Sequence, residues 1–191
     1  MRPRIAAVKT CVADELTLPT LIPLLMRVSW HCSSRGIARM KPFVVVALIS
    51  IVTVLILVQV PLDLQTHRLS RRATTYAAAA VAIVVVADVL TGGAITSVVV
   101  SVMSVVLVVG AYWVVHRVSP QSLGWGDVLL VAPLTLAVAY VAVERVLWWQ
   151  LVAAFTGAAH ATWVRVRSGR NHVPFGPHLL IAAWLMLVLS V

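Results

Sequence analysis

The sequence predicts an all-α fold, a polytopic membrane bundle of about six transmembrane helices. First, 61% of the 191 residues are hydrophobic and the mean hydropathy is +1.01. A soluble domain of this size needs a larger polar exterior than this composition supplies. Second, apolar runs of about 16 to 22 residues alternate with short polar stretches, and these lengths fit helices rather than barrel strands of about 10 residues. Third, the arginines cluster between the runs.

The apolar runs define the predicted elements in order. They cover residues 43–60, 74–90, 94–115, 128–143, 146–164 and 174–191. Pro61 is expected to end the first helix, because proline lacks a backbone N–H and clashes with the preceding turn. Thr91-Gly92-Gly93 predicts a tight turn between the second and third runs, and Glu144-Arg145 is a minimal polar link.

The distribution of arginine predicts the topology. The loops after the first, third and fifth runs fall on one side and carry Arg68, Arg71, Arg72, Arg117, Arg165, Arg167 and Arg170. The other side has only Lys41 and Arg145. The positive-inside rule therefore puts the arginine-rich loops in the cytoplasm and both termini outside. The formal net charge of +9 is accordingly assigned to topology and to anionic lipid head groups, and no nucleic-acid partner is expected.

Residues 1–41 form a basic arm distinct from the predicted membrane domain, residues 42–191. Its apolar stretch, residues 16–30, is too short to span a bilayer and contains Pro19, Pro23 and Arg27. Two interpretations stay open: a disordered or interfacial arm, or a segment upstream of a true start at Met40. The predicted topology puts the N-terminus outside, where the positive-inside rule disfavours a basic arm. This conflict favours the second interpretation, a start at Met40. The two cysteines, Cys11 and Cys32, both lie here, and we expect free thiols rather than a disulfide framework, a metal site or a cofactor site.

Two acidic residues at the edges of apolar runs are the candidate functional groups. Asp63 follows the first run, and Asp127 precedes the fourth in Gly124-Trp125-Gly126-Asp127. Alone, Asp127 is explained as an ordinary helix N-cap, and Asp63 as a polar residue after a span. An even number of crossings separates them, however, so both are expected at the cytoplasmic boundary. A turn does not require two glycines. Gly124 and Gly126 therefore predict an unwound segment of backbone that an extended peptide can approach closely.

A pair of neighbouring carboxylates has a specific chemistry. Both cannot ionise easily, so they share a proton. The ionised member can take a proton from an attacking water, and the protonated member can donate to an amide carbonyl and later to the leaving amine. Neither a Ser/His/Asp order, a HExxH zinc motif nor a phosphate-binding glycine loop is found in the sequence to compete for the role.

Three segments together resemble the signatures of the type IV prepilin peptidase family. They are Asp63-Leu64-Gln65-Thr66-His67-Arg68-Leu69, Gly124-Trp125-Gly126-Asp127-Val128 and Pro174-Phe175-Gly176-Pro177, in family order. The resemblance covers about residues 43–191, and it looks like the short form without a methyltransferase region. It implies a multi-pass aspartic peptidase of the bacterial plasma membrane that cleaves the leader of pilin-like precursors on the cytoplasmic side. Asp63 and Asp127 would be its catalytic pair, and Pro174–Pro177 would shape the site.

Two positions depart from the family pattern. Leu129 stands where the family usually has lysine, and Ser70 where it often has proline. These departures keep open a catalytically inactive relative that acts as a membrane interaction protein. Asp88, inside the second run and expected at the outer boundary, keeps open a small proton-coupled transporter. The sequence leaves the oligomeric state open.

Other positions predict packing. Ala153, Gly157 and Ala161 repeat every four residues and predict close helix contact. Tyr112, Trp113, Trp148 and Trp149 lie near predicted span ends and are expected as interface anchors. We expect His160 and His178 to be packing or boundary residues.

Overall fold

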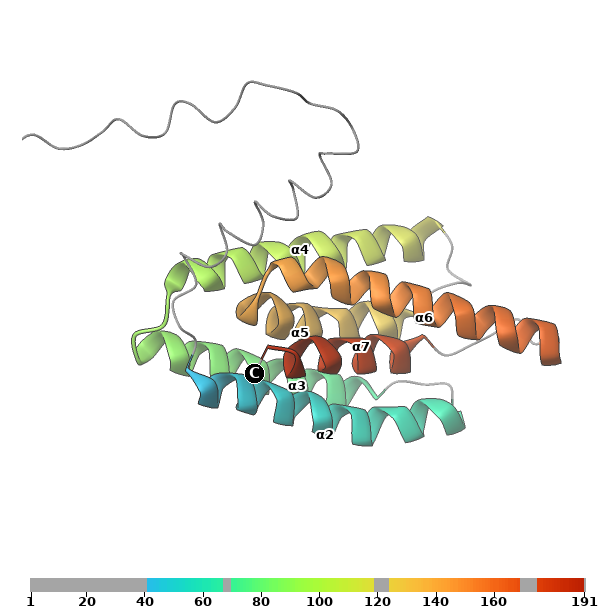
Figure 1. Ribbon diagram of the computed structural model, residues 1–191, viewed down its shortest axis with the longest axis horizontal. Helices are drawn as coiled ribbons and strands as arrows, with labels where there is room; N and C mark the ends of the chain where they lie inside the picture. Colours follow the sequence, from blue (N-terminus) through green and yellow to red (C-terminus); the bar gives the residue numbers. More distant parts are fainter. Residues whose placement is uncertain (1–40, 67–69, 119–123, 169–174, 191) are drawn as a thin grey trace, which may run out of the picture. The chain divides into compact units, whose positions relative to one another are not determined.

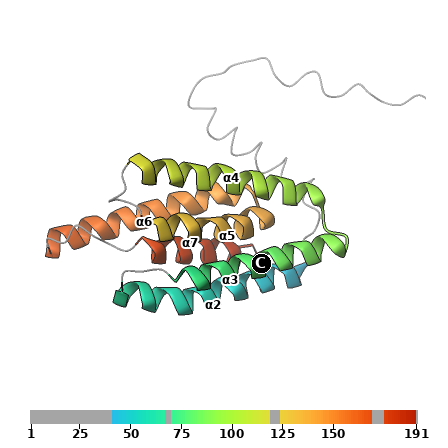
Figure 2. The ribbon, with the colours of Figure 1, turned by 180° about the vertical axis from the view of Figure 1, so that it is seen from behind.

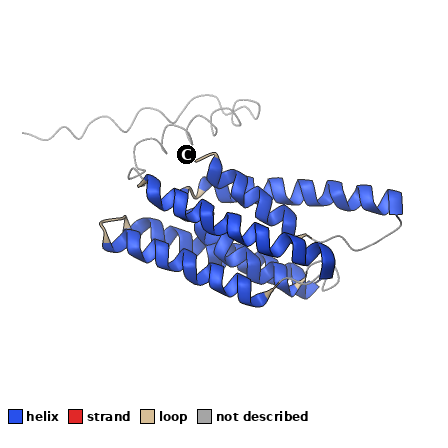
Figure 3. Ribbon diagram, turned by 90° about the horizontal axis from the view of Figure 1, so that it is seen from below, coloured by secondary structure: helices blue, strands red, loops and turns tan. Residues whose placement is uncertain are grey.

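The computed structural model describes residues 41–66, 70–118, 124–168 and 175–190, all within one compact unit, Met40–Val191. Within these residues every regular element is a helix, as Figure 3 shows, which confirms the predicted all-α class. The basic arm lies outside the described residues, as do the two cysteines, His67, Arg68, Leu69 and Pro174.

Each predicted apolar run forms one helix. The helices are α2 (Pro42–Thr66), α3 (Arg71–Leu90), α4 (Ile95–Val118), α5 (Trp125–Val141), α6 (Glu144–Ser168) and α7 (Gly176–Val188). The predicted end of the first helix at Pro61 is wrong, because α2 continues through Pro61 to Thr66. Proline removes a single hydrogen bond from the helix, and membrane helices tolerate that loss. Asp63 therefore lies on α2 rather than in the following loop.

Three of these helices are long and apolar enough to cross a bilayer. The candidate spans are Pro42–Asp63, Arg71–Leu90 and Ile95–Val118, and they indicate a membrane protein. The apolar helices α5 and α7 are shorter, at 17 and 13 residues. At a rise of about 1.5 Å per residue, α7 is about 20 Å long, against about 30 Å for the hydrocarbon core.

The two short helices lie at the centre of the bundle. Figures 1 and 2 show the helices side by side, with α2 and α3 along one side and α4 and α6 along the other. Helix α5 packs against α3, α4 and α7, and α7 packs against α2 and α6. Most residues of α5 are buried accordingly. Helices α5 and α7 are thereby surrounded by longer helices.

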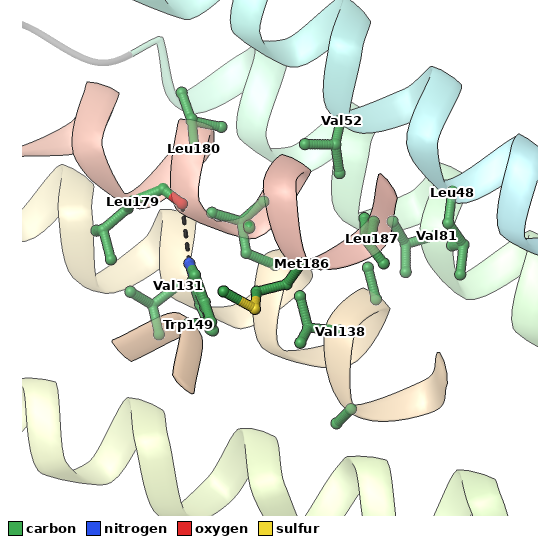
Figure 4. Close-up of a cluster of buried hydrophobic side chains, with 14 of the residues drawn as sticks. Leu48, Val52, Val81, Val131, Val138, Trp149, Leu179, Leu180, Met186 and Leu187 are labelled. Atoms are coloured by element: carbon green, nitrogen blue, oxygen red, sulfur yellow. Dashed lines mark hydrogen bonds between the residues drawn. The ribbon is translucent and has the colours of Figure 1, made fainter. Parts of the chain in front are cut away.

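The core forms where α7 meets α2, α5 and α6 (Figure 4). Trp149 of α6 is fully buried there, and its indole Nε1–H donates a 2.9 Å hydrogen bond to the carbonyl of Leu179. The expectation that Trp149 anchors the protein at the membrane interface is wrong, because its ring faces α7 rather than lipid. Buried tryptophan needs a partner for its N–H, and a backbone carbonyl supplies it.

The small residues of α6 make the predicted close contact. Ala153 and Gly157 are buried. A Cβ at Gly157 would lie 2.5 Å from a ring carbon of Phe175, so only glycine leaves room for that ring. This contact seats the N-terminal end of α7 against α6.

Candidate functional site

The predicted site residues come from helix ends at one end of the bundle. Asp63 is near the C-terminal end of α2, and Asp127 is in the first turn of α5. These two helix ends, together with the start of α7, lie toward the right in Figure 1. Both carboxylates belong to buried residues, with 5% and 8% of their surfaces exposed. Burial of ionisable groups is costly and requires a reason.

Asp127 occupies the third position of α5, not the N-cap. The N-cap is Gly124, which has extended backbone (φ −69°, ψ 144°) and cannot cap with a side chain. The N–H groups of Asp127 and Val128 donate to the Gly124 carbonyl at 3.1 and 3.4 Å. The explanation of Asp127 as an ordinary N-cap is therefore wrong, although its carboxylate accepts a hydrogen bond from the Gly124 backbone, as third-position acids do.

The glycines act differently from the expectation of unwound backbone. Gly126 lies within the first helical turn, and Gly124 has a φ that any residue adopts. A Cβ at Gly124 would lie 3.5 Å from Oδ2 of Asp127. Because Gly124 has no side chain, this contact with the carboxylate is not made.

The two carboxylates lie within electrostatic range of each other. Burial and then the negative charge of Asp63 raise the pKa of Asp127 to about 6, against the lowering effect of the Gly124 hydrogen bond. Asp127 precedes the fourth apolar run and lies outside the three candidate spans. Near neutral pH such a carboxyl exchanges its proton readily, which is the property required of an acid–base group.

A polar network that sequence reasoning missed lies one turn before Asp63. Gln59 is fully buried. Its Oε1 accepts from the Ser70 N–H at 2.9 Å, and its Nε2 donates to the Ser70 carbonyl and to Thr74 Oγ1, both at 3.0 Å. The network joins α2 to the start of α3 and stabilises the helix end that carries Asp63. Gln59 is the one polar amide in the first apolar run, and that signal could have revealed it.

Ser70 has a structural role that accounts for its difference from the family pattern. Its Oγ caps α3 by accepting from the Ala73 N–H at 3.4 Å, and its own N–H is used by Gln59. Proline at this position would lack that N–H.

The third segment opens α7 at the same end of the bundle. Phe175 is the N-cap residue, Gly176 is buried and Pro177 lies in the first turn, where a missing N–H costs nothing. Pro174 lies outside the described residues.

A second contact ties this turn to α6. Nδ1 of His160 and Nε2 of His178 are 2.9 Å apart, so the N–H of one ring donates a hydrogen bond to the nitrogen of the other. With the Gly157–Phe175 contact, this pair fixes the start of α7 against α6.

Asp88 lies at the opposite end of the bundle, at the end of α3, and is not part of the pair. Lys41 Nζ is 3.2 Å from its Oδ1, and the Tyr140 hydroxyl donates to its Oδ2 at 2.7 Å. Lys41 also donates to the carbonyl and hydroxyl of Thr91 at 2.8 and 2.7 Å. Asp88 thus joins α3 to the start of α2 and the end of α5.

Tyr112 of α4 also differs from its expected role as an interface anchor. It is partly buried, and its hydroxyl donates a 2.6 Å hydrogen bond to Gln150 Oε1 of α6. Its hydroxyl is within electrostatic range of Asp127. Tyr112 therefore links the two helices beside the first turn of α5.

Within the described residues, no three His, Cys, Asp or Glu side chains are grouped so as to hold a metal ion. Comparison with known proteins adds no assignment, since no family model, curated protein or solved structure matches the chain.

Proposed function

We propose that the protein is an integral-membrane aspartic endopeptidase that cleaves the leader of type IV pilin-like precursors at the cytoplasmic membrane face. One observation carries the proposal: two buried carboxylates, Asp63 and Asp127, come from remote helices and act electrostatically on each other. The three-motif resemblance supplies the substrate class. The partners are the precursor and the lipid bilayer.

The raised pKa of Asp127 supports a division of roles within the pair. Asp127 holds the shared proton, and ionised Asp63 takes a proton from the attacking water. The water oxygen bonds to the amide carbon while Asp127 protonates the carbonyl oxygen. As the tetrahedral intermediate collapses, the C–N bond breaks and the amine leaves with the proton held by Asp63. One hydroxyl of the intermediate returns its proton to Asp127, so the new carboxyl group forms and the pair is restored. General acid–base catalysis of this kind contributes about 10²–10⁴-fold.

Two further features support this assignment. Gly124 puts no side chain against the Asp127 carboxylate, which favours the approach of an extended chain. The helices α5 and α7, at about 26 and 20 Å, are shorter than the hydrocarbon core of about 30 Å, so water can reach one of their ends.

Co-expression with a pilin-like precursor tests the proposal. The intact protein is expected to release the leader, and Asp63→Asn and Asp127→Asn are each expected to stop release. Asp88→Asn is the matched control, since it removes a buried carboxylate at the other end of the bundle. Undiminished cleavage by either of the first two variants rules out the roles assigned here.

A non-catalytic relative is the second candidate, and Leu129 favours it. This partly exposed residue supplies no cation beside Asp127, where the family has lysine. Failure to cut any precursor encoded beside this protein's gene would favour that candidate. The transporter alternative loses its motivation, because Asp88 is held by Lys41 and Tyr140.

A further inference from the structure

Only one of the two polar atoms in the side-chain amide of Gln150, on α6, has a partner. Its Oε1 accepts a hydrogen bond from the Tyr112 hydroxyl at 2.6 Å. Its Nε2 is buried and donates to no acceptor among the residues that the structure describes. Such a donor raises the free energy of the folded protein, because it has lost its hydrogen bonds to water. Buried donors without an acceptor are uncommon in native proteins, so this one requires an explanation.

Comparison with Gln59 shows that joining two helices does not explain the free N–H. Gln59 and Gln150 are each the one amide side chain in their apolar runs, residues 43–60 and 146–164. Gln59 uses both of its polar atoms to join α2 to the start of α3. The contact between α4 and α6 uses only the Oε1 of Gln150, and an acceptor alone would be sufficient for it. The N–H of Gln150 is therefore available for another role.

The amide of Gln150 lies beside the candidate site. The Tyr112 hydroxyl that binds it is within electrostatic range of Asp127. Helix α5, which carries Asp127, packs against both α4 and α6. The unpartnered N–H is thus one hydrogen bond away from a group that interacts with Asp127.

The surroundings of the amide indicate which acceptor it suits. Tyr112 is on α4, within the candidate membrane span Ile95–Val118. An extended chain that reaches this depth has backbone carbonyls without partners of their own, and each one requires a donor. A neutral amide N–H matches a neutral carbonyl, whereas a carboxylate would need a cation to offset its lost hydration. The suitable acceptor is therefore a peptide carbonyl.

We propose that Nε2 of Gln150 donates a hydrogen bond to a backbone carbonyl of the precursor beside the scissile bond. Tyr112 is the positioning residue that holds the amide in place for this contact. The inference rests on the proposed function, since it assigns the carbonyl to the chain that is cut at Asp127. Because the contact is made to backbone, the precursor residue that supplies the carbonyl can vary in its side chain.

A double variant separates this role from a structural one. Tyr112→Phe/Gln150→Met replaces both partners with apolar groups of similar size, and removal of both partners leaves no group unsatisfied. The melting temperature without substrate should be unchanged or higher, whereas kcat/KM for precursor cleavage should fall about tenfold, mainly through KM.

Thr53→Val is the matched control, because it removes the acceptor of another hydrogen bond between helices. Trp184 Nε1 of α7 donates to Thr53 Oγ1 of α2 at 3.0 Å. This variant should show the opposite pattern, with a lower melting temperature and a kcat/KM of the folded fraction within about twofold of the intact protein.

The single variants test the positioning role of Tyr112. Tyr112→Phe keeps the Gln150 amide but releases it, so kcat/KM should fall less than it does in Gln150→Met. In the double variant, the loss should equal that of Gln150→Met alone, because Tyr112 acts through the amide. Additive losses would contradict the positioning role.

A binding measurement distinguishes failure of this inference from failure of the peptidase. The probe is a model precursor, a leader followed by an apolar helix of about 20 residues, and the protein carries Asp127→Asn. Adding Tyr112→Phe/Gln150→Met should raise the Kd about tenfold. That result without cleavage by the intact protein supports the Gln150 contact and counts against the peptidase. Cleavage with an unchanged kcat/KM in the double variant overturns the contact and leaves the peptidase standing. Absence of both binding and cleavage overturns both.

Discussion

The two ends of the helical bundle treat a buried carboxylate in opposite ways. At one end, Asp88 is held by the ammonium group of Lys41 and the hydroxyl of Tyr140. At the other, Asp127 is buried near a second acid, Asp63, and its pKa is raised to about 6. The same helices, α2, α3 and α5, contribute to both ends.

The two carboxylates differ in how their surroundings treat the negative charge. A carboxylate with a cation and a hydroxyl is stabilised in its charged form and joins helices. A carboxylate near another acid is destabilised in that form, and folding retains it at a cost in free energy. Such a cost is expected where a group is needed for a reaction, and for this reason we propose the active site at the Asp63–Asp127 end.

The largest expected effect is on catalysis. Asp127→Asn should lower precursor cleavage by about 10³-fold or more, because an amide cannot hold and donate the shared proton. Asp88→Asn, measured on the folded fraction, should cleave within about threefold of the intact protein. Rates come from gel-resolved cleavage at fixed precursor concentration. Equal losses in both variants would abolish the contrast between the ends.

The next effect concerns stability, and here the substitution of Asp88 is expected to cost more than the substitution of Asp127. Asp88→Ala should lower the free energy of unfolding by about 2–4 kcal/mol, since Lys41 loses its counterion and Tyr140 its acceptor; partial exposure of Lys41 keeps the loss moderate. Asp127→Asn should be neutral or stabilising, because it removes a like charge. Denaturant unfolding in detergent micelles measures both. A larger loss for Asp127→Asn would contradict the comparison.

The pH dependence follows from the pKa of Asp127. The folded-state value of about 6 exceeds the ordinary 3.8, so folding favours the protonated form. Stability is therefore greatest at low pH and falls by about 1–3 kcal/mol as pH rises from about 4 to about 6. Cleavage should also decline as pH rises through about 6, because the proton donor is lost. Asp127→Asn should remove this part of the stability change; an unaltered pH profile would contradict the assignment.

The smallest effect sharpens the role of the polar network before Asp63. Ser70→Pro should destabilise by about 1–2 kcal/mol, since it leaves Gln59 Oε1 buried without the Ser70 N–H. Ser70→Ala is the control, because it keeps that N–H and loses only the cap, for about 0.5–1 kcal/mol. Thermal melts distinguish them, and equal shifts would show that the Gln59 contact contributes nothing.

Much of the architecture could be predicted from the sequence. The apolar runs predicted the helices to within about six residues, because a chain segment in lipid has to satisfy its backbone polar groups internally, as a helix does. The placement of Asp63 and Asp127 at one end of the bundle was predicted because an even number of predicted membrane crossings separates the two residues in the sequence. Both predictions depend on length and order along the chain, which hydropathy records directly.

The partners of individual side chains were decided only by the tertiary structure. Helices that are apolar on nearly every face do not reveal which face meets a neighbour. Trp149 therefore proved to be a core residue. Asp88 forms an ion pair with Lys41, and the Ser70 N–H donates a hydrogen bond to Gln59. Rotation of each helix about its axis sets these contacts, and that rotation comes from packing against chain segments far away in sequence.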